Sequence, residues 1–133
     1  MTGGYGAFQT LAIANTSMGA HQTWLDALAD NIANINTYEP TTGNAFQAQY
    51  PIFQAKAGGG VDVVGVADSD PQGRMEQMPD NPLADENGYV RAPDIDMASE
   101  MGQIIMAQRG FQAATSITKS AQTEYDAALQ IGK

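Results

Sequence analysis

The chain has 133 residues, a formal net charge of −9 and a hydrophobic fraction of 43%. This length fits one compact domain, or one elongated subunit that completes its core with neighbouring subunits. The hydrophobic fraction argues against a chain that is disordered throughout. The excess of acids argues against nucleic acid as a partner, because neutralising phosphates requires clustered Lys and Arg. The absence of cysteine excludes disulfides, thiolate nucleophiles and Cys-ligated metal sites.

Charges and prolines divide the chain into three parts. Residues 38–96 hold ten of the 15 acids and all 6 prolines, whereas the two ends are almost neutral. Because proline breaks helix interiors, this partition predicts two long helices, within residues 1–37 and 94–133, on either side of a central module at residues 38–93. The predicted fold is mainly α with a small β module. The terminal helices pack as an antiparallel, coiled-coil-like hairpin, and the centre supplies a β-hairpin and loops.

The first helix is predicted over residues 7–36. Large apolar side chains recur every seven residues in one row, and a second row falls at the companion spacing of a coiled-coil seam. The rows are Leu11, Met18, Leu25 and Ile32, and Ala14, His21 and Leu28. Asn34 and Asn36 then favour local side-chain hydrogen bonds over helix, and Pro40 opposes continuation.

The last helix is predicted over residues 96–131. Asp96 is the expected N-cap, and Asp94 and Glu100 place negative charge at the positive end of the helix dipole. Two apolar stripes run along the helix, which implies more than one packing partner. The first contains Met97, Met101, Ile104, Phe111, Tyr125 and Leu129, and the second contains Ala114, Ile117, Ala121, Ala128 and Ile131.

The central module is predicted to contain short strands and turns. Runs at residues 46–53 and 61–66 favour strands, and turns are expected at residues 70–73, 81–82 and 87–88. The segment from Asp68 to Gly73 begins like a calcium loop. Pro71 interrupts it and Pro79 occupies the place of the bidentate Glu, so a turn with solvated acids is the better interpretation.

Neither catalysis nor ligand binding has a recognisable residue set. His21 is the only histidine, so no His-based metal pair can form within one chain. The serines lie in no nucleophile elbow, and the glycine clusters lack the context of a phosphate-binding loop. We expect no enzymatic activity, no catalytic residue, no cofactor and no metal site.

The faces of the two helices that an ordinary surface helix would fill with Lys and Glu carry mainly Ala, Gln, Asn, Ser and Thr. Two interpretations remain open. The chain is either a low-charge helical hairpin that docks on a single partner, or a subunit whose helices are buried in a polymer. Residues 1–15 show no cleavable signal peptide, and no stretch approaches the ~20 apolar residues of a membrane span.

Residues 25–37, LDALADNIANINT, resemble the N-terminal signature of the flagellar axial proteins of the rod and hook. Residues 60–66, 81–96, 100–113 and 128–132 resemble the proximal-rod members of that family, in matching order and spacing. The residues matching family motifs (the family-signature residues below) are Asn31, Ile32, Ala33, Asn34, Thr37, Gly88, Tyr89 and Pro93. The chain departs from the family at Asn81-Pro82, where His-Pro is common, and at Phe111, where Tyr is common.

The resemblance implies a structural subunit of the bacterial flagellar basal body, in the proximal rod. Such a subunit leaves the cell through the flagellar type III export apparatus without signal cleavage. It polymerises through its terminal helices into a helical drive shaft that crosses the periplasm and transmits torque. The implied partners are other copies of the chain, other rod proteins and a basal-body adaptor near the export gate, with no nucleic acid and no direct membrane span.

The helical seams are the expected assembly interface. Its predicted residues are Leu11, Met18, Leu25, Leu28, Ile32, Ile104, Phe111, Ile117, Tyr125 and Leu129. The alternative hypothesis is a soluble helical-hairpin adaptor or chaperone-like binding module.

Overall fold

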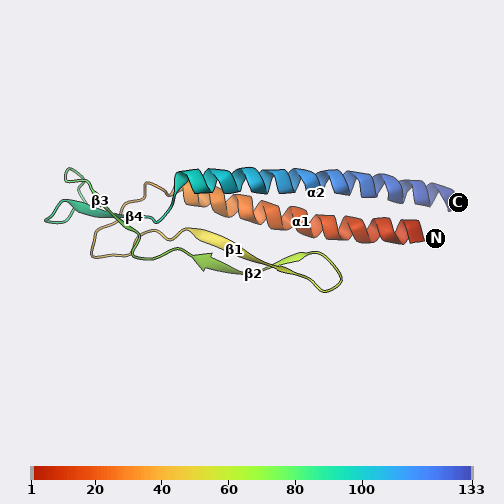
Figure 1. Cartoon of the computed structure of the whole chain (residues 1–133), viewed down its shortest axis with the longest axis horizontal. Helices are drawn as coiled ribbons and strands as arrows, with labels where there is room; N and C mark the ends of the chain where they lie inside the picture. The colour runs from red at the N-terminus through yellow and green to blue at the C-terminus, as the bar shows by residue number, and fades with distance from the viewer. Residues whose placement is uncertain (1, 133) are drawn as a thin grey trace. The chain divides into compact units, whose positions relative to one another are not determined.

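A computed structural model describes residues 2–132, with side chains from Gly6 to Gly132. In chain order the elements are α1 (Thr2–Ala33), β1 (Gln49–Ala55), β2 (Val61–Asp68), β3 (Arg74–Gln77), β4 (Tyr89–Ala92) and α2 (Met97–Ile131) (Figure 1). Strands β1 and β2 form one two-stranded sheet, and β3 and β4 form another. The predicted fold class is confirmed, since two long helices pack together and a small β module separates them in sequence.

The bounds of α1 differ from the predicted ones. The helix begins at Thr2 rather than Ala7. Glycine lowers helix propensity but keeps the backbone N–H that proline lacks, so the three glycines before Ala7 do not end the helix. The helix finishes at Ala33 rather than Asn36, because Asn34 begins a turn. The Asn34 side chain donates to the Asp30 carbonyl at 2.9 Å, and the Thr37 N–H donates to the Asn34 carbonyl at 3.0 Å.

The start of α2 agrees with the sequence. The Asp96 Oδ2 accepts a hydrogen bond from the Ser99 N–H at 3.1 Å, which is the geometry of an N-cap. The Glu100 N–H donates to the Asp96 carbonyl at 3.0 Å and opens the helical ladder. Asp96 is therefore the residue that begins α2, as predicted.

The chain divides into two compact units, and each takes segments from both helices and from the centre. The first unit comprises Met1–Leu25, Ile52–Gly65 and Ile105–Lys133. Its helices are antiparallel, because the Phe8 and Tyr125 rings lie 6.3 Å apart and the Thr118 hydroxyl lies 3.4 Å from the Met18 sulfur. The N- and C-terminal ends of this helix pair consequently lie together (Figure 1).

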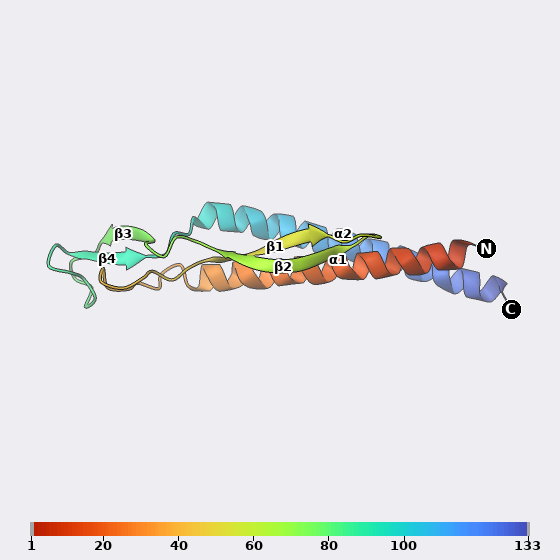
Figure 2. The same cartoon turned by 90° about the horizontal axis from the view of Figure 1, so that it is seen from below.

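The connection between β1 and β2 lies against α1 in the first unit, as Figures 1 and 2 show. The Val61 N–H donates to the Thr16 hydroxyl at 3.1 Å, and this hydroxyl donates to the Ile13 carbonyl at 2.7 Å. Gly60 has φ +97°, and a Cβ added there would lie 2.7 Å from the Thr16 oxygen. The glycines of this connection therefore allow the hairpin to lie close to the helix.

The second unit comprises Asp26–Pro51 and Val66–Ile104. In it, β3 and β4 are antiparallel, with Arg74 opposite Ala92 and Gln77 opposite Tyr89. The Arg91 guanidinium donates to the carbonyls of Gln72 at 2.5 Å and Thr41 at 2.8 Å, which joins two loops to β4. Fully buried apolar side chains in this unit include Leu28, Ala48, Val90 and Ala92.

The strands occupy much of the predicted central module. The predicted run at residues 46–53 begins too early, since β1 starts at Gln49 and continues to Ala55. Pro51 lies inside it, which a two-stranded sheet allows because each strand has one unpaired edge. The turns near residues 71–72, 82–83 and 86–87 agree with the predicted ones.

Candidate assembly surfaces

The two helices of the first unit meet along rows of alanine. Ala7 and Ala14 on α1, and Ala107, Ala114 and Ala121 on α2, are each at most 4% exposed. Both rows repeat every seven residues, as in a coiled coil. Small side chains allow close backbone approach, and the alanines are the most deeply buried residues of this helix pair.

The predicted assembly residues occupy three kinds of position within the chain. Leu28 is fully buried, and Ile117 and Leu129 are 49% and 51% exposed. The half-buried members are Leu11, Met18, Leu25, Ile32, Ile104, Phe111 and Tyr125. Their role in contacts between subunits stays a prediction, and only the exposed and half-buried ones have apolar surface left to bury against a neighbour.

Exposed large apolar side chains of the first unit lie on α2 as well as on α1 and the β1–β2 hairpin. Met106 is 61% exposed, Ile105 47% and Ile131 85%. Met106, Ala113 and Ile117 are seven and four residues apart, so they lie along one helix face. Exposed apolar side chains that share a helix face mark an interaction surface more often than scattered single residues do.

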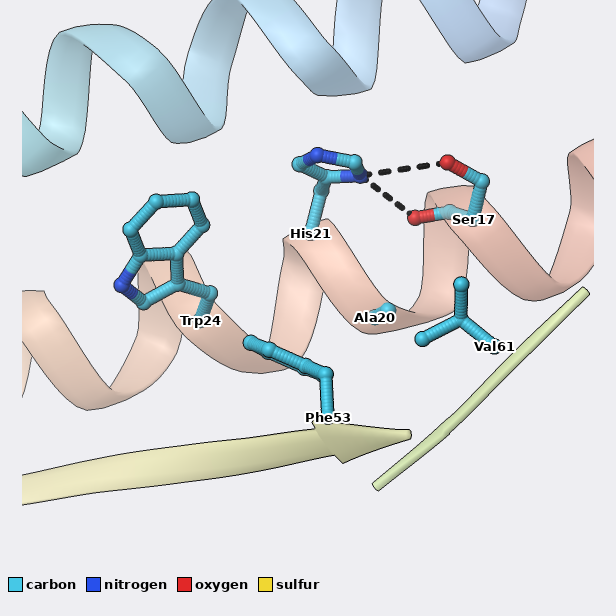
Figure 3. A pocket seen from close by; sticks show the side chains of 6 residues that line it. All are labelled: Ser17, Ala20, His21, Trp24, Phe53 and Val61. Atoms are coloured by element: carbon cyan, nitrogen blue, oxygen red, sulfur yellow. Dashed lines mark hydrogen bonds between the residues drawn. The ribbon is translucent and has the colours of Figure 1, made fainter. Parts of the chain in front are cut away.

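Two apolar grooves of the first unit share Ser17 and His21. The larger, about 460 Å³, lies between the helices and is lined on α2 by Gly110, Ala113, Ala114 and Ile117. The smaller, about 200 Å³, lies between α1 and the hairpin, where Trp24, Phe53 and Val61 complete it (Figure 3). The Trp24 and Phe53 rings are 6.3 Å apart in an edge-on arrangement.

His21 is held by its own helix. Its Nδ1 lies 2.7 Å from the Ser17 carbonyl and 3.3 Å from the Ser17 hydroxyl, as the dashed lines in Figure 3 show. A carbonyl oxygen only accepts, so Nδ1 carries a proton and donates to it. The described residues contain no group of three His, Asp or Glu side chains that could hold a metal ion. Its hydrogen bonds and its place in the lining of both grooves make His21 a packing residue.

In the second unit, Asn31, Tyr50 and Glu100 form a buried polar cluster. Asn31 and Glu100 are 0% and 1% exposed. The Tyr50 hydroxyl donates to the Glu100 Oε1, and the Asn31 amide donates to Oε2 at 3.3 Å. Asn31 also accepts from the Gln49 N–H at 2.9 Å and donates to the Gln49 carbonyl at 3.1 Å. These bonds join α1, β1 and α2.

The environment of Tyr50 favours its neutral form. Burial raises the pKa of Tyr50 well above its usual value, and the hydrogen bond to Glu100 and the charges of Glu100 and Asp94 raise it further. The folded chain therefore keeps a proton on Tyr50 that the unfolded chain releases near pH 10. This contribution to stability is complete below about pH 10 and is lost as the pH rises above it.

Tyr50→Phe is expected to lower the free energy of unfolding at pH 7 by about 1–3 kcal/mol, because it leaves a buried carboxylate oxygen without its donor. The difference in free energy of unfolding between wild type and variant is expected to shrink above about pH 10. There the unfolded wild-type chain is stabilised because its Tyr50 ionises. Urea unfolding at several pH values measures both effects. Tyr38→Phe is the matched control, because its hydroxyl makes only a long, exposed contact with Asn36 at 3.4 Å. Equal effects of the two variants would contradict the role assigned to Tyr50.

The family-signature residues lie in the second unit. Thr37 donates through its hydroxyl to the Asn34 side chain at 3.1 Å. Pro93 is fully buried, and its carbonyl accepts from the Arg74 Nε at 3.2 Å. Gly88 has φ +83° in the turn before β4. Asn31 belongs to the buried cluster, Tyr89 lies in β4, and Ile32 and Ala33 lie in the last turn of α1. These contacts give the motifs a role in folding.

Asp85 organises the loop between β3 and β4. Its carboxylate accepts from the N–H groups of Asn87 and Tyr89 at 2.9 Å each, and from the Thr41 hydroxyl at 3.1 Å. The backbone hydrogen bond from Tyr89, with those from Thr41, Asn87 and Gly88, lowers the pKa of Asp85. The charged form therefore holds this loop, so residues 85–88 act as a turn.

Sequence reasoning missed two residues of these surfaces. Glu100 was assigned only to the helix dipole, yet it is buried. The available indication was its spacing, since it precedes Ala107 by seven residues and so falls on the alanine row. Gly110 was noted only within a motif, although it lies against His21 in the larger groove.

Comparison with known proteins gives the class of the chain. Residues 86–131, which include β4 and α2, match the family model of the flagellar basal body rod FlgEFG protein C-terminal region. The chain is thus similar to flagellar rod proteins over its C-terminal third. No helix in the described part of the chain combines the length and hydropathy needed to cross a bilayer.

Full-length relatives define the family. The flagellar basal-body rod protein FlgC of Salmonella typhimurium is 31% identical over 91% of this chain and 94% of its own length. The FlgC protein of Yersinia enterocolitica is 32% identical over 91% of this chain and 94% of its own length. The FlgC protein of Bacillus subtilis is 24% identical over 96% of this chain and 99% of its own length. The chain belongs to the FlgC family of flagellar basal-body rod proteins.

Proposed function

We propose that this chain is a structural, non-enzymatic subunit of the rod of the bacterial flagellar basal body. The observation that carries the proposal is its similarity to FlgC proteins along nearly its whole length. The exposed apolar face of α2, around Met106 and Ile117, supports it further, because such a face is suited to burial between subunits.

The terminal helices are the proposed means of polymerisation into a proximal-rod drive shaft that transmits torque. Residues 1–25 contain no Asp, Glu, Lys or Arg, so covering this part of α1 desolvates no full charge. In this proposal residues 1–37 and 94–133 form the rod core, and the acidic residues 38–93 make outer contacts. Leu11, Met18, Leu25, Ile117 and Leu129 supply apolar contacts between subunits.

The proposed partners are further copies of the chain, other rod proteins and the adaptor near the export gate. The location is the rod within the cell envelope, which the chain reaches through the flagellar type III export apparatus without signal cleavage. Support comes from the similarity to FlgC proteins along nearly the whole chain.

Ile117→Asp is expected to abolish swimming without unfolding the chain. Ile117 is 49% exposed, so a carboxylate there remains hydrated in the isolated subunit but would be buried in a rod contact. The purified variant should stay folded and lose no more than about 2 kcal/mol of the free energy of unfolding. Cells with this variant as their only copy should not swim, and purified basal bodies should lack the chain.

The matched control is Ser116→Asp, which adds the same charge at the neighbouring exposed position of the same helix. It should fold, enter basal bodies and support swimming. Normal swimming of the Ile117 variant would contradict the proposed contact. Recovery of the wild-type chain only in a discrete soluble complex, and never in basal bodies, would favour the adaptor hypothesis over a rod subunit.

A further inference from the structure

The alanine rows of the first unit cannot by themselves define how the two helices are aligned. Ala107, Ala114 and Ala121 repeat every seven residues on α2, and Ala7 and Ala14 repeat in the same way on α1. Sliding one helix by seven residues would again place alanine against alanine. A register is fixed only where a residue other than the repeated alanine faces the partner helix. In coiled coils, buried polar or bulky residues fix the register in this way.

His21 is the unlike residue on α1. It occupies the position after Ala7 and Ala14 in the seven-residue repeat. Its Nδ1 is bonded to the Ser17 carbonyl at 2.7 Å, so the ring is fixed on its own helix and cannot swing away without losing that bond. A large, oriented ring thus interrupts a row of methyl groups.

Gly110 is the residue on α2 that admits this ring. A Cβ added at Gly110 would lie 2.9 Å from the His21 Cε1, and closer still to Nε2 and Cδ2. At this position of α2 only glycine, which has no Cβ, leaves room for these ring atoms. A seven-residue shift would bring His21 against Gln103 or Ile117 instead, and each carries a Cβ and a long side chain.

We propose that His21 and Gly110 form a steric key that fixes the register of the antiparallel helix pair in the first unit. The key determines which residues of α1 and α2 lie side by side on the surface of this unit. It is a property of the single chain, so it holds whether or not the chain assembles into a rod.

The first test is a double-mutant cycle of melting temperatures. At an open helix position, replacing Gly by Ala raises stability because Ala is the better helix former. Gly110→Ala is expected to do the opposite and lower the melting temperature by at least about 4 °C, because its methyl group meets the ring. In the His21→Ala background the same change should raise the melting temperature. Gly102→Ala, at an exposed position with open space, is the control and should raise it in both backgrounds.

The second test measures register by cross-linking. The chain has no cysteine, so introduced pairs are the only thiols that a short bismaleimide can join. Cysteines replacing Met18 and Thr118 report the observed register, because these side chains touch at 3.4 Å. Cysteines replacing Met18 and Phe111, or Met18 and Tyr125, report a shift of seven residues in either direction. All chains also carry Asn31→Ala, since Asn31 and Glu100 join the same two helices.

With His21 and Gly110 intact, the 18–118 pair should cross-link about tenfold faster than either shifted pair. With His21→Ala and Gly110→Ala together, a shifted pair should come within about threefold of it. In the melting experiment, a rise in melting temperature for Gly110→Ala alone would overturn the proposal. In the cross-linking experiment, so would faster cross-linking of the 18–118 pair that survives the double substitution. The proposal would also fail if the chain that keeps His21 and Gly110 cross-linked all three pairs equally fast, or none of them.

Discussion

Leu28→Asp is expected to leave the chain largely unfolded under conditions in which the wild-type chain is folded. Leu28 is fully buried, so the substitution removes a buried leucine and introduces a carboxylate with no designed partner. The two effects together cost about 4 kcal/mol or more, a large share of the 5–15 kcal/mol that stabilises a typical domain. Circular dichroism and urea unfolding of the purified chain measure the loss, and swimming should be lost with it.

Ala29→Asp is the matched control for this substitution. Ala29 is the next residue of α1 and is exposed, so the same charge enters the same helical turn without burial. Its cost should remain about 1 kcal/mol, from lower helix propensity and a negative charge near the C-terminal end of α1. Leu28→Met, which nearly conserves volume, should cost less than about 1.5 kcal/mol. A folded Leu28→Asp chain with wild-type stability would contradict the burial that the structure gives this side chain.

Gly73→Ala is expected to lower the free energy of unfolding by about 3 kcal/mol or more, although it adds a single methyl group. Gly73 has φ +60°, a region that alanine adopts at a cost. A Cβ there would lie 2.5 Å from the Ala45 Cβ and even closer to the Ala92 carbonyl oxygen. Ala45 and Ala92 are both buried, so neither can move aside freely. Urea unfolding gives the loss of stability.

Gly58→Ala is the control that separates the cost of backbone strain at positive φ from the cost of a steric clash of the added Cβ. Gly58 also has positive φ, +88°, but nothing lies within 4 Å of a Cβ built there. Only the backbone strain remains, and this should cost about 1 kcal/mol. If Gly73→Ala and Gly58→Ala destabilise the chain equally, the close contact at Gly73 contributes nothing and the explanation fails.

The long helices were predictable because their determinants are local. All six prolines lie outside them, Asp96 caps α2 through its own side chain, and Asn34 ends α1 by bonding to Asp30. The bounds of the strands were predicted less accurately than those of the helices, because β-structure depends on pairing between distant residues. The contact between Glu39 and Arg91 spans much of the central module and leaves no periodic pattern in the sequence.

The predicted apolar rows of the two helices contain both large and small side chains, and within the chain the buried ones among them are mostly alanines. The part that the large side chains play between subunits stays a prediction. Periodicity favours large apolar residues such as Leu11 and Met18, whereas close helix packing favours the smallest ones, here Ala14 and Ala114. The buried cluster was beyond sequence reasoning. A lone Glu at a helix start is usually solvated, and only folding brings Tyr50 and Asn31 to Glu100.

Asn31 has a consequence for association with other chains. Its amide is bonded to both the N–H and the carbonyl of Gln49, the first residue of β1, at 2.9 and 3.1 Å. A side-chain amide offers the same donor and acceptor as a peptide group, so α1 presents to this strand what a neighbouring strand would present. A two-stranded sheet leaves its outer edges open to pairing with foreign strands. The N–H and carbonyl of Gln49 are already bonded to Asn31. A foreign strand that pairs with these two groups would first have to displace α1.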